Sequence, residues 1–462
     1  MKFFSVKFKP AILIYAAPMQ LVWLIYLLAL WPGLMSPDSV GQWNQALSGQ
    51  INDAHPAFHT MFLAVLARIR PNPALVALVQ ILVLSFVAGY ILCEFESRGI
   101  PRRLLITAAL IFAFSPVNSL MVNAIWKDIL YSIAFLGLSG ILLKMIVTHG
   151  AWLKKGWRIG LLAVTAFSVA IFRHNGVFDS FGTLILLIFG FRSQTKRLLL
   201  ALALTLSLWL GIRGPFYDIM KVKKVPGLFL SSQELFQIAA HLKAGTEITE
   251  PEAAFLNKIL PIENAWNYDC YTSGVFFYDP RLNRQFVSDH LSELNQIFLA
   301  LTLRAPEVNL KHLACSSSLV WKVFDNSQRF STIPTYFDHG KWRTIFYPPT
   351  ETNVSFSPKI PWLTQPLMEF VDATHYPRFI WFIWRPALYL YLSFMIVIMA
   401  ALRCRDWRFL FLLAPIMIHS AFLVISLSSQ DFRYQYPVYL FALLFWPLLF
   451  YRRTVTQAQP KP

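Results

Sequence analysis

Four short stretches of this 462-residue sequence carry the side chains that could do chemistry, and each lies where a long apolar segment ends. They are residues 36–59, 126–128, 173–176 and 430–434. Each stretch holds carboxylates, imidazoles or cations, which are the groups that move protons and bind anions. Because ionisable groups are costly next to lipid, their convergence on one side of a membrane predicts a functional site.

Each of these residues also has a structural explanation when it is taken alone. Asp38 could cap a helix that starts at the next residue. The long cations Lys127, Arg173 and Arg433 could reach from a spanning helix to the membrane interface. Asp431 and Arg433 could simply pair with each other. It is the gathering of four such stretches, rather than any single residue, that favours a site.

The composition indicates where the segments between these stretches must lie. Hydrophobic residues make up 56% of the chain and charged residues only 14%, with a mean hydropathy of +0.50. A soluble globular protein has roughly 45–50% apolar and about 25% charged residues. So large an apolar excess cannot be buried in a water-soluble core, and a bilayer must surround part of the chain.

Segments long enough to cross a bilayer predict an all-α multi-pass membrane protein with about ten transmembrane helices. The predicted spans are residues 11–31, 74–93, 104–124, 129–147, 159–172, 177–191, 198–215, 380–402, 408–427 and 437–451. The loop 32–73 follows the first span, and its apolar stretch 56–67 is too short to cross. We therefore expect a juxtamembrane helix over residues 56–70.

Basic residues recur in groups of three in every second gap between these spans. They are Lys2, Lys7, Lys9, Arg98, Arg102, Arg103, Lys154, Lys155, Arg158, Arg192, Lys196, Arg197, Arg403, Arg405, Arg408, Arg452, Arg453 and Lys461. With the acids Glu94, Glu96 and Asp406, these gaps carry +15 of the formal net charge of +17. This is the positive-inside pattern, so it predicts cytoplasmic termini and accounts for the charge without nucleic acid as a partner.

The predicted topology divides the chain into four parts. Residues 1–215 form an N-terminal transmembrane module that contains the outer loop 32–73, and residues 216–379 form a mostly helical extracytoplasmic domain. Residues 380–453 form the C-terminal transmembrane helices. Residues 454–462 form a polar cytoplasmic tail without the apolar residues that an ordered segment needs.

The outer domain has helix signals of its own. Thr249 and Glu252 form a capping-box pattern, and apolar periodicity predicts helices over residues 231–243 and 283–304. Cys270 and Cys315 both fall in this domain, where oxidation is possible. A disulfide between them is a hypothesis that their spacing cannot decide. No spacing of Cys and His resembles a zinc site.

These features resemble the GT-C class of multi-spanning glycosyltransferases, which use polyprenyl-phosphate sugars as donors. Members carry an essential Asp soon after the first span, followed by juxtamembrane helices, and Asp38 lies at the matching place within Ser-Pro-Asp-Ser. The stretches 126–128, 173–176 and 431–434 resemble motifs of bacterial relatives that include serotype-converting O-antigen glucosyltransferases. Many members have an Asp-Glu pair where this chain has Asp38-Ser39, so a role for a divalent metal in this loop stays open.

The resemblance implies an enzyme of the inner (plasma) membrane that acts on its outer face. It would move a sugar, a hexose such as glucose, from a polyprenyl phosphate such as undecaprenyl phosphate to a surface polysaccharide, lipopolysaccharide or lipid-linked glycan. Asp38 would be the general base for the acceptor hydroxyl, and attack from the opposite face would invert the anomer. A retaining route would need a second carboxylate, for which Asp53, Asp128 and Asp431 are available.

The leaving lipid phosphate needs cations to hold its charge, and the resemblance implies Lys127, Arg173 and Arg433 for this role. No organic cofactor is expected. The residues expected to support the site are Ser39, Gln42, His55, His59, Asp128, His174, Asn175, Asp431 and Tyr434.

Other classes of protein fit parts of the same pattern. A transporter of lipid-linked sugars would also need polar residues near a cavity, although it would normally show internal repeats or polar residues at mid-membrane. An O-antigen polymerase or ligase has a similar number of spans and essential arginines, but no Asp-based first loop. A scaffold would survive the loss of all four polar stretches. Dependence on Asp38 separates the glycosyltransferase from these alternatives.

Overall fold

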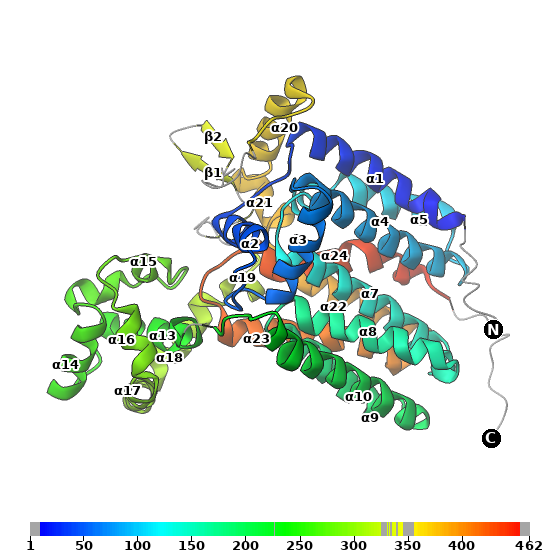
Figure 1. The fold of residues 1–462 in the computed structure, drawn as a ribbon. Helices are drawn as coiled ribbons and strands as arrows, with labels where there is room; N and C mark the ends of the chain where they lie inside the picture. The colour runs from blue at the N-terminus through cyan, green and yellow to red at the C-terminus, as the bar shows by residue number, and fades with distance from the viewer. Residues whose placement is uncertain are drawn as a thin grey trace.

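The computed structural model describes residues 10–225, 227–324, 330, 332, 335–338, 341–344 and 355–452 (Figure 1). The described chain is helical except for one antiparallel hairpin of β1 (Thr335–Asp338) and β2 (Lys341–Thr344). The predicted tail 454–462 lies outside the described residues, as do the basic residues Lys2, Lys7, Lys9, Arg453 and Lys461.

Within the described residues, six helices are long and apolar enough to cross a membrane, so this part of the chain has the character of a helical membrane protein. The candidate spans are Ala11–Ala29, Ala74–Glu96, Lys127–Val147, Arg192–Ile219, Pro386–Cys404 and Trp407–Ser426. They correspond to six of the ten spans expected from hydropathy. The other four expected segments form helices shorter than a full span, so their crossing of the membrane stays a prediction.

One of these four expected segments is broken in the middle. The expected span 104–124 folds as two helices, Arg102–Phe114 and Pro116–Met121. Pro116 occupies the first turn of the second helix, and the Ser115 hydroxyl accepts a hydrogen bond from the backbone N–H of Asn118. Proline cannot continue the preceding helix, and a serine cap begins a new one, so the break is encoded locally.

The helices of the membrane part pack around one large apolar core. They are α1 (Ala11–Ala29), α4 (Ala74–Glu96), α5 (Arg102–Phe114), α6 (Pro116–Met121), α7 (Lys127–Val147), α8 (Gly156–Phe172), α9 (Gly176–Gly190), α10 (Thr195–Gly211), α11 (Tyr217–Ile219), α22 (Pro386–Cys404), α23 (Ala414–Ser426) and α24 (Tyr436–Phe445). Helix α7 is central, because it packs against α4, α8 and α24. Lys127 and Asp128, the first residues of α7, therefore lie near the centre of one end of the helix bundle.

The outer loop after α1 folds as two short helices, α2 (Pro37–Ser48) and α3 (Ala57–Ile69). The helix expected over residues 56–70 is thus present as α3, and its place at the membrane surface stays a prediction. Ser36 caps α2, and its hydroxyl accepts a hydrogen bond from the backbone N–H of Ser39. The alternative in which Asp38 caps the helix is wrong. Helix α2 begins at Pro37, two residues before the start at Ser39 that this alternative assumes, and Ser36 is the cap. Asp38 stands in the first turn, where a carboxylate is favoured by the helix dipole.

The stretch 216–379 has two parts that differ in what they pack against. The first part has an apolar core of its own that includes Leu235, Phe236 and Leu294. Its helices are α12 (Gly227–Leu230), α13 (Ser232–Ala244), α14 (Glu250–Ile259), α15 (Gly274–Phe277), α16 (Arg284–Asp289), α17 (Leu291–Arg304) and α18 (Pro306–Ser316). We call residues 227–316 the outer module, which stands apart from the bundle in Figure 1.

The second part joins the membrane bundle. It contains α19 (Ser318–Trp321), α20 (Pro361–Ala373) and α21 (Pro377–Ile383). Leu319, Leu367 and Val371 belong to the large core of the transmembrane helices.

The capping box predicted at Thr249 and Glu252 is present in the outer module, at the start of α14.

A close approach between α8 and α9 yields a test of the fold. A Cβ on Gly176 would clash with the backbone carbonyl of Val169 and lie 3.1 Å from the ring of Tyr131. Overpacking of this kind costs about 1–3 kcal/mol, so Gly176→Ala should lower the thermal unfolding temperature of the purified protein. A Cβ on Gly160, within α8, meets nothing within 4 Å, so Gly160→Ala is the matched control. Equal melting temperatures for the two variants would contradict the close approach.

Candidate active site

The four polar stretches meet at one end of the bundle, and Arg433 joins three of them. Its Nη2 lies 2.9 Å from Oδ2 of Asp38, in the first turn of α2. Its Nη1 lies 3.9 Å from Oδ2 of Asp128, at the start of α7. Arg173, at the end of α8, completes the group, because its Nη1 lies 3.3 Å from Oδ1 of Asp128. Residues nearly 400 positions apart are thus neighbours.

The local sequence of the 430–434 stretch explains how Arg433 is aimed. Asp431 caps the short 3₁₀ turn η6 (Phe432–Gln435), and its Oδ1 accepts a hydrogen bond of 3.1 Å from the backbone N–H of Arg433. Its Oδ2 lies 3.0 Å from Nε of the same arginine. The guanidinium also lies over the ring of Trp126, 4.7 Å from its centroid. The simple Asp431–Arg433 pairing is therefore real, and it directs the arginine toward the other carboxylates.

The Asp38 side chain is half-buried, and the positive charges of Arg433 and Lys127 lie close to it. The hydroxyl of Ser36 accepts a hydrogen bond of 2.8 Å from Nε1 of Trp126, which fixes the start of α2 beside α7. Burial alone would raise the pKa of Asp38, but the nearby charges of Arg433 and Lys127 outweigh it and hold that pKa below its ordinary range. The carboxylate is therefore ionised at neutral pH.

His55 bridges this carboxylate and a cation. Nζ of Lys127 lies 3.2 Å from Nδ1 of His55, and Nε2 of His55 lies 3.7 Å from Oδ1 of Asp38. The positive charge of Lys127 and burial lower the pKa of His55 to about 3, so its imidazole is neutral. Because an ammonium can only donate, Nδ1 must accept, and the proton sits on Nε2, which faces Asp38.

Arg173 is as buried as Arg433 and contacts Asp128, Tyr131 and Tyr434. Its Nη1 donates to the backbone carbonyl of Tyr434 at 3.3 Å, and its guanidinium lies 4.7 Å from the centroid of the Tyr434 ring. Asp128 is fully buried between Arg173 and Arg433. The Asp128 carboxylate in the first turn of α7 also gains from the helix dipole. Arg173 is thus paired with Asp128 and with the Tyr434 carbonyl, and its expected contact with a phosphate stays a prediction.

The remaining predicted residues lie around this centre. His174 contacts the backbone carbonyl of Asp53 at 3.0 Å, and the amide of Gln42 donates to the hydroxyl of Thr60 at 3.0 Å. His59 is fully buried, and neither of its ring nitrogens has a hydrogen-bond partner among the described residues. Asn175 precedes α9 without capping it through its side chain.

A second layer of ionisable residues was missed by the sequence analysis. The hydroxyl of Tyr131 donates to Asp179, whose Oδ2 lies 3.2 Å from Nδ1 of His419. Nε2 of His419 lies 2.7 Å from the carbonyl oxygen of Tyr434, the same atom that Arg173 binds. These residues lay inside predicted spans, where an ionisable side chain is itself a signal of function.

Arg213 also lies inside a predicted span, 198–215, and the sequence analysis did not include it among the site residues. Its Nη2 lies 2.5 Å from Oδ2 of Asp53, and Oδ1 of Asp53 accepts a hydrogen bond of 2.9 Å from the backbone N–H of Ala57. Arg213 belongs to the irregular turn η3 (Ile212–Phe216) at the end of α10. This pair ties the outer loop to α10, and it leaves Asp53 paired and away from Asp38.

The central group can bind an anion beside an ionised carboxylate. Three carboxylates, Asp38, Asp128 and Asp431, face three cations, Lys127, Arg173 and Arg433. Among the described residues, no three His, Cys, Asp or Glu side chains are placed to hold a metal ion. No known protein-family model matches the chain, and no curated protein or solved structure matches it.

The buried position of Asp128 yields a prediction about stability. Asp128→Ala would leave two buried guanidinium groups short of a partner, and breaking a buried ion pair in this way costs about 3–5 kcal/mol. The variant should unfold at a clearly lower temperature in detergent. Asp279→Ala breaks a pair with Arg281 at 2.9 Å on the outer module, where the arginine is more than half exposed, and is the control. A similar loss of stability in both variants would contradict the charge arrangement.

Proposed function

We propose that the protein is a membrane glycosyltransferase that uses a polyprenyl-phosphate sugar as its donor. The observation that carries the proposal is the contact between Asp38 and Arg433, at 2.9 Å. A sugar transfer from a phosphate needs a base for the acceptor and a cation for the leaving group, close enough to act on one anomeric carbon. This pair supplies both from the outer loop and the turn before α24.

The proposed reaction is a single displacement. The acceptor hydroxyl gives its proton to Asp38, and its oxygen forms a bond to the anomeric carbon. The bond from that carbon to the phosphate oxygen breaks, and its electron pair stays on the lipid phosphate. Arg433 and Lys127 hold the resulting negative charge, and the attack inverts the anomer.

The ion pair between Arg433 and Asp38 gives donor binding a second effect, on the availability of the Asp38 carboxylate. The donor phosphate competes with Asp38 for Arg433, because a guanidinium binds phosphate in the same bidentate manner as a carboxylate. Binding of the donor would thus release Asp38 toward the acceptor. Arg173, which is held by Asp128 and Tyr434, keeps the turn in place rather than contacting the phosphate.

The proposal places the site on the outer face of the inner membrane, with ten spans and cytoplasmic termini. The positive-inside distribution of charge supports this orientation. Three of the basic gaps also lie together in space, since Lys144 lies 3.0 Å from Glu94 and His149 lies 3.8 Å from Asp406. The acceptor would be a surface polysaccharide, lipopolysaccharide or lipid-linked glycan, and the sugar a hexose such as glucose.

The role of Asp38 is tested by Asp38→Asn. General-base catalysis contributes roughly 10²–10⁴-fold, so transfer of radiolabelled hexose from polyprenyl phosphate in membrane vesicles should fall by at least about a hundredfold. The protein should remain folded and in the membrane. Asp218→Asn, on an exposed residue of α11, is the matched control and should keep full activity. Wild-type transfer by Asp38→Asn would remove Asp38 from the base role.

The pH dependence of kcat/KM gives a second test. A carboxyl group with a lowered pKa stays ionised, and a histidine with a pKa lowered to about 3 stays neutral, throughout the range from about pH 5 to about pH 7. Neither group should therefore produce an acid limb in that range. The measurement is kcat/KM for the donor in the wild type and in His55→Gln. A limb with a midpoint near pH 6 that disappears in His55→Gln would show that His55 titrates instead.

A further inference from the structure

The outer module has an open cavity of about 530 Å³ away from the site at the bundle end. Its lining residues are Lys243, Asn264, Ala265, Asn267 and Tyr268. Cavities of about 300–1,000 Å³ are the size that holds a small ligand or a few sugar units. The lining is polar, with one aromatic residue, which does not suit a lipid tail.

The backbone at this cavity is unusual. Four successive residues that are not glycine have a positive φ: Asn264 (57°), Ala265 (48°), Trp266 (54°) and Asn267 (52°). Residues with a Cβ rarely adopt this left-handed conformation, and Asn tolerates it best. Ala265 and Trp266 have no such tolerance. Residues held in this way cluster at binding and catalytic sites, since the surrounding structure must keep them there.

Trp266 is the residue that holds the turn. Its side chain is 2% exposed, and its Nε1 donates to the carbonyl oxygen of Leu260 at 3.0 Å. The same ring packs near Phe276 in the core of the outer module. Burial of this one side chain therefore fixes the turn and leaves Asn264 and Asn267 exposed beside the cavity.

We propose that this cavity binds an oligosaccharide segment of the acceptor, an inference that rests on the proposed function. A sugar hydroxyl both donates and accepts hydrogen bonds, and each Asn side chain offers both. Lys243 adds a charged donor to ring or hydroxyl oxygens. Tyr268 supplies an aromatic surface of the kind that packs against the C–H groups of a sugar. The cavity lining therefore offers hydrogen-bonding groups and one aromatic ring, which suit a polar ligand that carries little charge.

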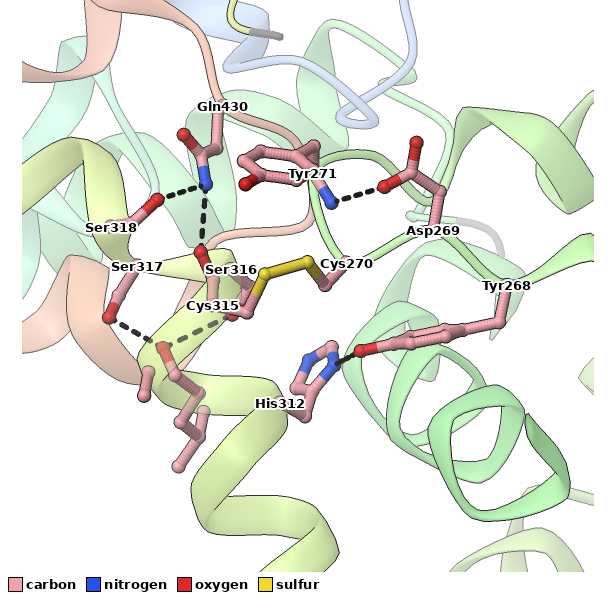
Figure 2. Close-up of a disulfide and its surroundings, with 12 residues drawn as sticks. Tyr268, Asp269, Cys270, Tyr271, His312, Cys315, Ser316, Ser317, Ser318 and Gln430 are labelled. Atoms are coloured by element: carbon pink, nitrogen blue, oxygen red, sulfur yellow. Dashed lines mark hydrogen bonds between the residues drawn. A yellow bond between two sulfur atoms is a disulfide. The ribbon is translucent and has the colours of Figure 1, made fainter. Parts of the chain in front are cut away.

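The cavity is tied to the Arg433 turn through the chain that follows it. Cys270 forms a disulfide with Cys315, and the hydroxyl of Tyr268 contacts Nδ1 of His312 at 2.8 Å, so two links fasten this segment to α18 (Figure 2). The disulfide is the pairing that the sequence had left as a hypothesis.

Two backbone hydrogen bonds then join the segment to the loop that leads into the site. The N–H of Gln430 donates to the carbonyl of Tyr271 at 3.0 Å, and the N–H of Ser273 donates to the carbonyl of Ser428 at 2.8 Å. The side-chain amide of Gln430 also donates to the carbonyl of Cys315 at 2.9 Å, as Figure 2 shows. An acceptor held at the cavity would thus lie on the framework that carries Arg433.

The test uses the full-length protein in lipid nanodiscs and saturation-transfer NMR. The probes are neutral trisaccharides of glucose, galactose and mannose. The variant Lys243→Ala/Asn267→Gly removes two polar groups while keeping the turn, because glycine accepts a positive φ. It should weaken binding at least about tenfold, and Lys243→Ala alone should weaken it less. Lys311→Ala, on an exposed residue of α18, is the control and should bind like the wild type.

Two outcomes would overturn the proposal. One is a wild-type protein that binds none of the trisaccharides, and the other is a double variant that binds them as well as the wild type does. Asp38→Asn should keep trisaccharide binding while losing transfer, which separates this proposal from the proposed function. In the transfer assay the double variant should raise the acceptor KM and leave the donor KM unchanged, an effect that a loss of stability would not give.

Discussion

The organisation of this protein depends on how the charge of Arg433 is balanced inside an apolar bundle. A buried guanidinium needs partners that compensate for its lost hydration, and for Arg433 these partners are carboxylates. Here the carboxylates come from three separate elements: Asp38 from the outer loop, Asp128 from the central helix and Asp431 from the turn itself. The loop, the helix and the turn must therefore hold their places together, and none can shift without exposing a charge to a poor environment.

A second layer supports this balance at longer range. The carbonyl of Tyr434 accepts from Arg173 and contacts His419, and His419 in turn contacts Asp179. A backbone atom beside Arg433 is thus held from two directions by ionisable side chains. Asp179 and His419 lie on α9 and α23, so two helices that carry no residue of the central charged group still support its position.

The sequence predicted those features that depend on local patterns. Apolar length located six long helices, and the Thr249–Glu252 pattern located the start of α14. The ionisable residues at the ends of predicted spans do come together in one charged group. Mean hydropathy over residues 104–124 is insensitive to the break at Ser115-Pro116. The sequence therefore predicted one span where the structure has two helices. The roles of Asp179, Arg213 and His419 depend on partners far along the chain, so no local pattern could assign them. The same holds for His174, whose partner proved to be the backbone of Asp53.

The stretch between the two groups of spans shows a similar limit. The sequence predicts one domain over residues 216–379, because this stretch lacks the long apolar segments of the spans. The structure instead divides it at residues 316–318, where the chain leaves the core of the outer module and joins that of the bundle. Burial depends on which surface a helix meets, and composition does not specify that surface.

The hydrogen bonds from Gln430 to Tyr271 and Cys315 have a consequence for how the protein is made. Asp38 and Arg433 are separated by 395 positions in the sequence. During synthesis, the early helices can insert long before the turn that carries Arg433 exists. That turn is linked by these hydrogen bonds to the disulfide-linked outer module, so the contact between Asp38 and Arg433 can form only after nearly the whole chain has been made. The Asp38–Arg433 contact therefore joins the membrane helices that are made first to the outer module and the helices that are made last.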